Sequence, residues 1–266
     1  HLAHTRCASL SSWNASAGWT SVNGGTSPRY DAVATTAWAS ATPKYAPTLG
    51  VNSSGQVHVV YMSKSGSTYY VYYTTYTAGV WSSPPTALHS NTTEVAYPTL
   101  EVRSNDWLYV AFSEYSSSYF SFTRVSYTYF NGSAWSAKAN LILQNGTGVD
   151  LRYVSMAADD EGNIQVAVEQ DGTGSYPPGS VWGAYFNGTG WTTFQSSTPI
   201  DSLGWDKPAV GVTLGAGVTS DVIVSARDGT DPDGVYRWKW GGSSWAQYES
   251  ATLESTDSFA ALEKRA

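Results

Sequence analysis

The sequence predicts an all-β fold, a five-bladed β-propeller whose last blade is closed by pairing of a C-terminal strand with N-terminal strands. Between turns, apolar and polar residues alternate with the period of two that is typical of half-buried strands. No stretch sustains the 3.6-residue period of a helix. Five hairpin-like segments end in Trp followed by a small or polar residue, at Trp19, Trp81, Trp135, Trp191 and Trp245. Their spacings of 62, 54, 56 and 54 residues suit propeller blades of four short strands each.

Four of the repeats share two apolar elements separated by a polar turn. The element after the turn comprises Val57–Tyr61, Leu108–Phe112, Ile164–Val168 and Val222–Ala226. The element before it comprises Ala46–Leu49, Tyr97–Leu100, Tyr153–Met156 and Lys207–Val210. We interpret these as the second and the first strand of each blade, because Asn, Asp, Gly and Ser in the intervening segments favour tight turns.

The fifth repeat is divided between the two ends of the chain. His1–Cys7 opens directly as a second strand, and Asp257–Glu263 resembles the first strands of the other repeats. The termini are therefore expected to meet in one sheet, which closes the ring and leaves no long free edge. The segment from Asn23 to Lys44 is interpreted as a loop with one irregular strand; as a blade of its own it would give six blades. The single domain, 1–266, then has blades at 253–266 plus 1–22, 46–88, 96–141, 150–200 and 205–250.

Charge and cysteine content exclude several classes of partner. A net charge of −7 argues against a nucleic-acid partner, which requires a Lys/Arg surface. No apolar run approaches the roughly 18 residues needed to span a bilayer. The lone Cys7 can form neither an intramolecular disulfide nor a cysteine-based metal site.

Two features favour a secreted or cell-surface glycoprotein. The chain is Lys-poor and rich in Ser, Thr, Tyr and Asn, and it starts at His1 as a mature or excised product would. It also has six Asn-x-Ser/Thr sequons, at Asn14, Asn52, Asn91, Asn131, Asn145 and Asn187. The alternative for Asn131 and Asn187 is that Asn-Gly merely forms a turn before a strand.

Three segments carry a family resemblance: Ala46–Tyr61, Val222–Gly229 and the blade end Tyr129–Ser136. They resemble the sialidase-like (BNR-type) propeller repeats of secreted and surface proteins, and the Trp endings resemble those of propeller lectins. The resemblance covers nearly the whole chain and concerns the scaffold. The Ser-x-Asp-x-Gly-x-Thr-Trp box of true sialidases is absent from the sequence, so the resemblance implies a fold rather than sialidase activity.

The ligand face of such a propeller is expected where the chain enters each first strand and leaves each second strand. The entry positions are Tyr45, Ala96, Arg152, Asp206 and Asp257, and the exit positions are Met62, Ser113, Glu169, Arg227 and Arg6. These positions vary while the Trp residues repeat, which favours one asymmetric site on the axis over five equivalent sites. The candidate ligand-binding residues are Tyr45, Tyr97, Arg152, Tyr153, Glu169, Trp205, Asp206, Lys207, Arg227 and Asp257. The alternative is a set of ion pairs that closes the channel mouth.

No catalytic residue, metal ligand or cofactor is assigned. A glycosidase needs two carboxylates flanking the scissile bond, for which Glu114, Glu169, Asp206 and Asp257 are candidates, but no carboxylate triad is evident. The acidic turn Asp228–Gly234 lacks the last carboxylate of a calcium loop. His1 and His4 would point to opposite faces of a strand.

We therefore expect an extracellular, non-catalytic, lectin-like module that binds carbohydrate at a single axial site. Two alternatives remain. One is a structural subunit of a filament or surface layer, in which the Tyr-rich segment Tyr69–Tyr73 marks an outer blade edge for self-association. The other is a glycoside hydrolase of sialidase-like or arabinanase-like architecture. The expected partner is a glycan or another extracellular ligand.

Overall fold

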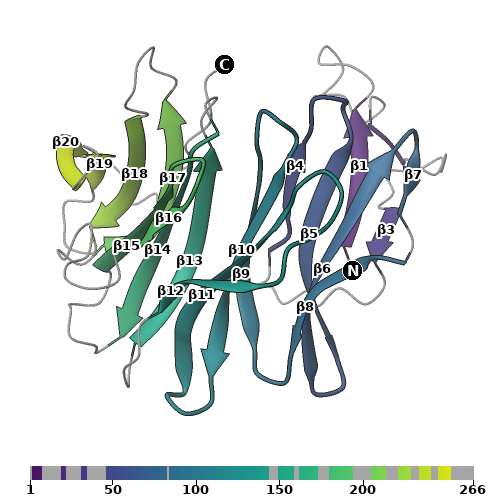
Figure 1. Ribbon diagram of the computed structural model, residues 1–266, viewed down its shortest axis with the longest axis horizontal. Coiled ribbons are helices and arrows are strands. Elements are labelled where there is room, and N and C mark those ends of the chain that lie inside the picture. The colour runs from purple at the N-terminus through teal and green to yellow at the C-terminus, as the bar shows by residue number, and fades with distance from the viewer. Residues whose placement is uncertain are drawn as a thin grey trace.

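The computed structural model describes twenty strands and the turns between them (Figure 1). It covers the backbone of residues 2–7, 19–21, 31–34, 46–82, 84–143, 149–158, 162–172, 180–193, 205–213, 221–228, 234–240 and 245–252. Side chains are described within 46–82, 84–143, 149–158, 162–171 and 180–191. Within these residues the fold is all-β, and none of it forms a helix that could cross a membrane.

Three antiparallel sheets follow one another along the well-described part of the chain. Sheet I consists of β4 (Thr48–Val51), β5 (Val57–Ser65), β6 (Thr68–Thr77), β7 (Val80–Trp81) and β8 (Thr86–Asn91). Sheet II consists of β9 (Val95–Val102), β10 (Leu108–Ser116), β11 (Ser121–Phe130) and β12 (Ala139–Leu143). Sheet III consists of β13 (Val149–Ala158), β14 (Ile164–Gly172), β15 (Ser180–Phe186) and β16 (Trp191–Thr193). Each runs as a meander from its first strand outward, as the repeat predicts.

The remaining strands form shorter pairings on either side. At the C-terminal side β17 (Trp205–Thr213) pairs with β18 (Asp221–Asp228), and β19 (Gly234–Trp240) pairs with β20 (Trp245–Thr252). At the N-terminal side β1 (Leu2–Cys7) pairs with β2 (Trp19–Ser21) and with β3 (Asp31–Ala34). The predicted first and second strands are thus confirmed in four repeats. The proposed closing strand, Asp257–Glu263, lies outside the described residues.

The first strands of consecutive sheets lie side by side. Contacts join β4 to β9, β9 to β13, and β13 to β17, and Figure 1 shows the sheets ranged next to one another in chain order. Of the segment Asn23–Lys44 the structure describes residues 31–34, which form β3. The prediction that Tyr69–Tyr73 forms an outer edge is wrong, because β6 pairs with β5 on one side and with β7 and β8 on the other.

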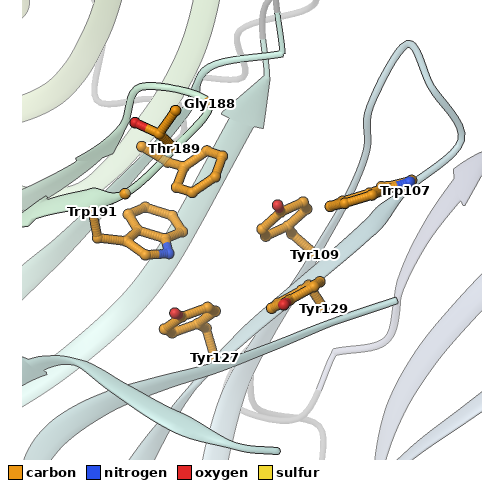
Figure 2. Close-up of a pocket in the computed structure, with 9 residues that line it drawn as sticks. Trp107, Tyr109, Tyr127, Tyr129, Gly188, Thr189 and Trp191 are labelled. Atoms are coloured by element: carbon orange, nitrogen blue, oxygen red, sulfur yellow. The ribbon is translucent and has the colours of Figure 1, made fainter. Parts of the chain in front are cut away.

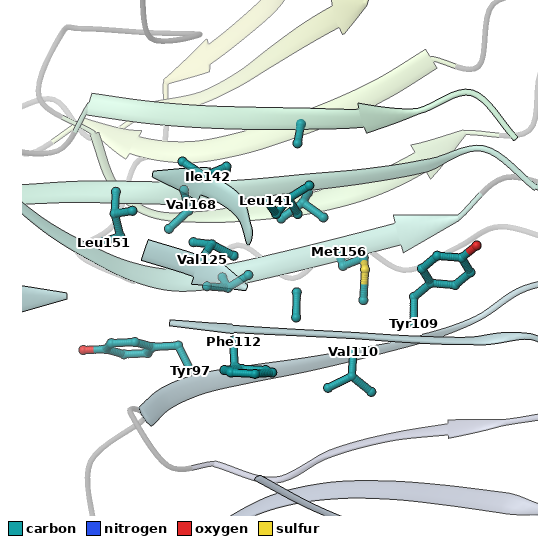
Figure 3. Close-up of a cluster of buried hydrophobic side chains, with 14 of the residues drawn as sticks. Tyr97, Tyr109, Val110, Phe112, Val125, Leu141, Ile142, Leu151, Met156 and Val168 are labelled. Carbon is teal, nitrogen blue, oxygen red and sulfur yellow. The ribbon is translucent and has the colours of Figure 1, made fainter. Parts of the chain in front are cut away.

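The core fills the space between sheets, so a central strand is covered on both faces. Every residue of β10 from Leu108 to Glu114 is buried. Figure 3 shows Val110 and Phe112 on one side of β10 and Tyr109 on the other, toward Met156 of β13; Phe112 is stacked on His89 of sheet I. A strand that is buried on both faces loses the alternation of a half-buried one, and this explains the continuous apolar run.

The repeated Trp-Ser ending is a packing and hydrogen-bonding unit. Trp81, Trp135 and Trp191 each lie against the aromatic residue five positions earlier, with centroid distances of 5.0, 5.5 and 5.3 Å. The Ser82 hydroxyl accepts a hydrogen bond from the Thr75 backbone N–H at 3.0 Å. Ser136 does the same for Tyr129 at 3.0 Å. The motif therefore ties the outermost segment of a sheet to its third strand, which accounts for its repetition.

Candidate functional site

The strand registers place the predicted entry and exit positions opposite one another. Ala96 is paired with Ser113, Arg152 with Glu169, and Asp206 with Arg227. Residues directly opposite in an antiparallel pair share one face of the sheet. In the Arg152–Glu169 pair the cation lies on the first strand, whereas in the Asp206–Arg227 pair it lies on the second strand. The register thus brings the entry and exit residues of each pair to one face of the sheet, and the single axial site stays a prediction.

Four of the ten candidate residues have described side chains, and these four lie together. They are Tyr97, Arg152, Tyr153 and Glu169. The charges of both Arg152 and Glu169 act on the Tyr97 hydroxyl, and the Tyr97 and Tyr153 rings are 5.1 Å apart. The side chains of Trp205, Asp206, Lys207 and Arg227, like Tyr45 and Asp257 altogether, lie outside the described residues.

The two tyrosines have a strained backbone. Tyr97 has a φ of 53° and Tyr153 a φ of 51°, in the left-handed region that bulky side chains avoid. Each directly follows the entry residue of its sheet, Ala96 or Arg152, at the point where the pairing register shifts. Such a conformation costs roughly 1–3 kcal/mol and persists only where the surroundings enforce it, often at ligand sites. Its recurrence at the same register shift in two adjacent sheets marks a feature of the scaffold, and this feature sets Tyr97 and Tyr153 beside Arg152.

Arg152 is held by two carboxylates that the sequence analysis did not select. Its Nε donates to Asp150 Oδ2 at 2.8 Å, and its terminal nitrogens donate to Asp150 and Asp171. Burial opposes the guanidinium charge, but the hydrogen bond and charge of Asp150 outweigh it and raise the pKa of Arg152. Asp150 also accepts from the backbone N–H of Phe122 at 2.9 Å. Arg152 therefore forms ion pairs with two aspartates that the sequence analysis did not predict, within a cluster that also contains the two tyrosines.

Burial controls the titration of the tyrosine nearest this cluster. Tyr97 is 9% exposed, and its pKa lies well above the ordinary value because burial disfavours the phenolate more than the Arg152 charge favours it. Tyr97 is therefore a neutral hydrogen-bonding group at neutral pH.

A second charged cluster surrounds Glu114, which is 3% exposed on β10. Its carboxylate lies 2.6 Å from Lys138 Nζ, 3.8 Å from Arg124 and 3.9 Å from His89 Nε2. Burial alone would raise the pKa of Glu114, but the hydrogen bonds of Lys138 and Ser126 prevail and lower it. A general acid needs the opposite shift, so Glu114 is suited to structure rather than to acid catalysis.

An aromatic pocket lies at the other end of the strands, between sheets II and III (Figure 2). Its volume is about 490 Å³. It is lined by Trp107, Tyr109, Tyr127, Tyr129, Phe186, Gly188, Thr189, Gly190 and Trp191. Sequence analysis noted Trp191 only as a blade-end residue and did not combine it with the tyrosines. A comparison of equivalent positions in neighbouring repeats was the signal that could have found it.

The sequon asparagines act as turn residues. The side-chain oxygen of Asn131 accepts from the backbone N–H groups of Ser133 and Ala134, both at 3.0 Å. Asn187 does the same for Thr189 and Gly190, at 3.1 and 3.0 Å. Both asparagines are exposed, so a turn role accounts for them and leaves their glycosylation a prediction. Asn14 and Asn145 lie outside the described residues.

Metal binding has no support within the described residues, where no three His, Cys, Asp or Glu side chains are grouped closely enough to hold an ion. The acidic turn Asp228–Gly234 and the pair His1 and His4 are not covered by this statement, because their side chains are outside that part of the chain.

Comparison with known proteins establishes the fold class. No protein-family profile matches the sequence, and no curated protein matches it. Among solved structures, polysaccharide lyase Uly1 aligns with a TM-score of 0.55 at 13% identity, over 92% of this chain and 58% of that chain. A PL25 ulvan lyase aligns with a TM-score of 0.55 at 11% identity, over 77% of this chain and 55% of that chain. A thermostable family-43 glycoside hydrolase aligns with a TM-score of 0.52 at 10% identity, over 81% and 77%.

At these identities the likeness is one of fold. The chain is a β-propeller, and the scaffold-level resemblance expected from its repeat is confirmed. The chain spans little more than half the length of the two lyases.

Proposed function

We propose that this chain is an extracellular, non-catalytic carbohydrate-binding propeller with five blades and one axial site. The observation that carries the proposal is the cluster in which Tyr97 and Tyr153 lie beside Arg152, which is itself held by two aspartates. It is supported by the fold, whose similar solved structures include proteins named as polysaccharide lyases and a glycoside hydrolase. Secretion and glycosylation belong to the same proposal.

The chemistry of the cluster suits a sugar. A pyranose has an apolar C–H face, which packs on the electron-rich face of an aromatic ring, and hydroxyl groups around its edge. Tyr153 is half-buried and offers both a ring and a hydroxyl. Arg152 and its two aspartates supply donors and acceptors that are already fixed in position by one another. Such preorganisation lowers the entropy lost on binding.

Binding is favoured over catalysis by the state of the same groups. A lyase that acts on an acidic sugar needs a cation for the substrate carboxylate and a basic group for proton abstraction. Arg152 already bonds two carboxylates, and burial keeps Tyr97 protonated. Neither group is prepared for elimination, whereas both can hydrogen-bond a neutral hydroxyl.

A glycan-array screen with folded variants tests the proposal. We expect Tyr153→Ala and Arg152→Ala each to weaken binding by about tenfold or more, the usual loss for a central contact. Arg124→Ala is the matched control, because its side chain is exposed to nearly the same extent as that of Arg152, 37% against 36%, and also pairs with a carboxylate. Unchanged binding by both axial variants would refute the axial site. Incubation of bound glycans with the wild-type protein, followed by assay of new reducing or unsaturated ends, separates binding from catalysis.

A further inference from the structure

We propose that the aromatic pocket between sheets II and III is a second binding site, for a neutral pyranose ring. The pocket stands on its own geometry and does not depend on the axial site. The two places lie at opposite ends of β10. Tyr109, near its start, lines the pocket, whereas Ser113, near its end, pairs with Ala96 beside Tyr97.

The packing that the fold requires at this junction recurs between sheets I and II. Trp191 lies 5.2 Å from Tyr127 of the preceding sheet, and in the same way Trp135 lies 4.9 Å from Tyr73. Phe186 and Phe130 occupy equivalent positions beside these tryptophans. A Tyr–Trp contact across the junction is therefore part of the scaffold.

Three further aromatic residues of the lining are not repeated in sheet I, although one of them, Tyr129, has an aromatic equivalent in sheet III, Tyr185. Trp107, Tyr109 and Tyr129 line the pocket, and the registers of β5–β6 and β10–β11 make their equivalents Gln56, His58 and Thr75. There, His58 Nδ1 is hydrogen-bonded to the Tyr73 hydroxyl at 2.7 Å. Sheet I has an imidazole in place of Tyr109, stacked on Tyr73, and no ring in place of the other two residues, so the fold does not require these three side chains. A group that the scaffold does not need is the better candidate for a ligand contact.

The extra rings form a continuous wall. Tyr129 is stacked on Trp107 with an interplanar angle of 11° and on Tyr109 with an angle of 20°. Figure 2 shows these three residues on one side of the space and Trp191 on the other, with the turn at Gly188 and Thr189 beside it. Arg103 lies 5.6–5.9 Å from the ring centres of Trp107, Tyr109 and Phe186, which holds these rings in place through cation–π contacts. The wall is thus formed before a ligand arrives.

The lining determines the class of ligand. No lining residue carries a charge, and the polar atoms contributed by side chains include the hydroxyls of Tyr109, Tyr127, Tyr129 and Thr189. Aromatic faces bordered by hydroxyls match a ring with an apolar face and peripheral hydroxyl groups. A volume of about 490 Å³ lies within the range of small-molecule sites. The nearby Arg103 guanidinium is not part of the lining and is already engaged by three of the rings and by the Tyr109 hydroxyl, at 3.5 Å, so these properties favour a neutral sugar over an acidic one.

The test uses the full chain made in bacteria, because a glycan on Asn187 would lie next to the pocket turn. Neutral and acidic oligosaccharides on an array are the probes. The main variant, W107Q/Y129T, introduces the residues that sheet I carries at the equivalent positions. Gly190→Leu is the second variant. It adds a bulky side chain at a residue that lines the pocket without removing packing, because a Cβ at Gly190 meets no atom within 4 Å. Phe120→Ala is the matched control, an 82% exposed aromatic residue at the other end of the same hairpin.

Both pocket variants are made in the Tyr153→Ala background, so that the axial site does not contribute. We expect them to lose binding to neutral glycans by about tenfold or more relative to Tyr153→Ala itself, and Phe120→Ala in the same background to keep it. Neutral-glycan binding that persists in either folded pocket variant overturns the proposal, as does a wild-type protein that binds only acidic glycans or none. If W107Q/Y129T does not fold, Gly190→Leu decides. Loss in the pocket variants but not in Tyr153→Ala separates this site from the axial one. Loss of binding in Tyr153→Ala alone would support the axial site and overturn the pocket.

Discussion

The buried contact between Lys138 and Glu114 allows a sharp test of the packing between sheets. Lys138→Met keeps most of the side-chain volume and removes the ammonium group. Glu114 then remains 3% exposed, with Arg124 and His89 nearly 4 Å away. Breaking a buried pair in this way costs about 3–5 kcal/mol. We expect the lower end, about 3 kcal/mol, because the Lys138 side chain is 25% exposed and solvent screens part of the interaction.

The two halves of the pair are not equivalent. Glu114→Gln leaves a lysine that can still reach water, whereas Lys138→Met leaves a buried anion that cannot. We therefore expect Glu114→Gln to destabilise the protein less than Lys138→Met, and the double variant to be more stable than Lys138→Met alone. Lys64→Met is the matched control. Its exposed ammonium lies 3.0 Å from the Tyr69 hydroxyl and 4.5 Å from the centre of that ring, and the effect of the substitution at this surface position should stay within about 0.5 kcal/mol.

The pH dependence of this effect has a definite sign. In the wild type the pKa of Glu114 is lowered, so its stabilising contribution is present above the ordinary carboxyl pKa and is lost as pH falls through the lowered value. Without Lys138, burial raises the pKa of Glu114. The pKa of His89, which burial lowers and Lys138 lowers further, then rises. Protonation of either group relieves the buried anion, so the deficit of Lys138→Met relative to wild type should shrink from pH 7 to pH 5.

Urea unfolding followed by circular dichroism at both pH values measures these differences. At pH 7 the expected loss corresponds to a fall in melting temperature of about 6–12 °C for a domain of this size. The reasoning is refuted if Lys138→Met destabilises no more than Lys64→Met. It is also refuted if the deficit grows on acidification.

Three further predictions test the backbone and the ring. In chemical unfolding, Gly188→Ala should lower the free energy of unfolding by about 1 kcal/mol, because Gly188 has a φ of +86°, whereas Gly190→Ala should change it by close to nothing. Neither added Cβ meets an atom within 4 Å, so the difference measures backbone strain, and equal effects would contradict it. Tyr153→Asn should lose axial glycan binding while leaving stability unchanged or higher by up to about 1 kcal/mol, since Asn tolerates the left-handed region; a loss of stability together with binding would mean that Tyr153 is structural. In the five-blade proposal, Thr256 stands opposite Cys7 as Leu151 stands opposite Gln170. Thr256→Cys should therefore form a disulfide, detected as loss of free thiol, whereas Glu254→Cys should not; persistence of both thiols in Thr256→Cys argues against closure.

Much of the fold was predictable because its signals are local. Alternation marks the strands, and the Trp-Ser ending marks the edge of a sheet through contacts within a few residues, such as Ser136 with Tyr129. Even the pairing of Arg152 with Glu169 followed from alignment of the repeats. Asp150 could have been found as well, because it lies two positions before Arg152 and a period of two places both on one face.

The conformations that define the candidate sites were not predictable in the same way. Tyr97 precedes Pro98, and a residue before proline is driven toward extended backbone, yet its φ is 53°. The packing of the surrounding sheet outweighs this local preference, and the residues next to Tyr97 in the sequence do not predict it. The pocket depends on Trp107 and Trp191 lying on opposite sides of the junction between two neighbouring sheets, and only the spatial order of the sheets brings them there.

The separation between the two sites makes their independence a physical expectation. From Tyr109 to Ser113 the strand β10 advances about 13 Å, at roughly 3.3 Å per residue. Substitutions farther apart than about 7–10 Å without shared partners usually add, and the pocket lining has no residue in common with the Arg152 cluster. The free-energy losses of Tyr153→Ala and W107Q/Y129T should therefore add for a glycan long enough to occupy both ends. For a monosaccharide, each variant should abolish one binding event and leave the other unchanged.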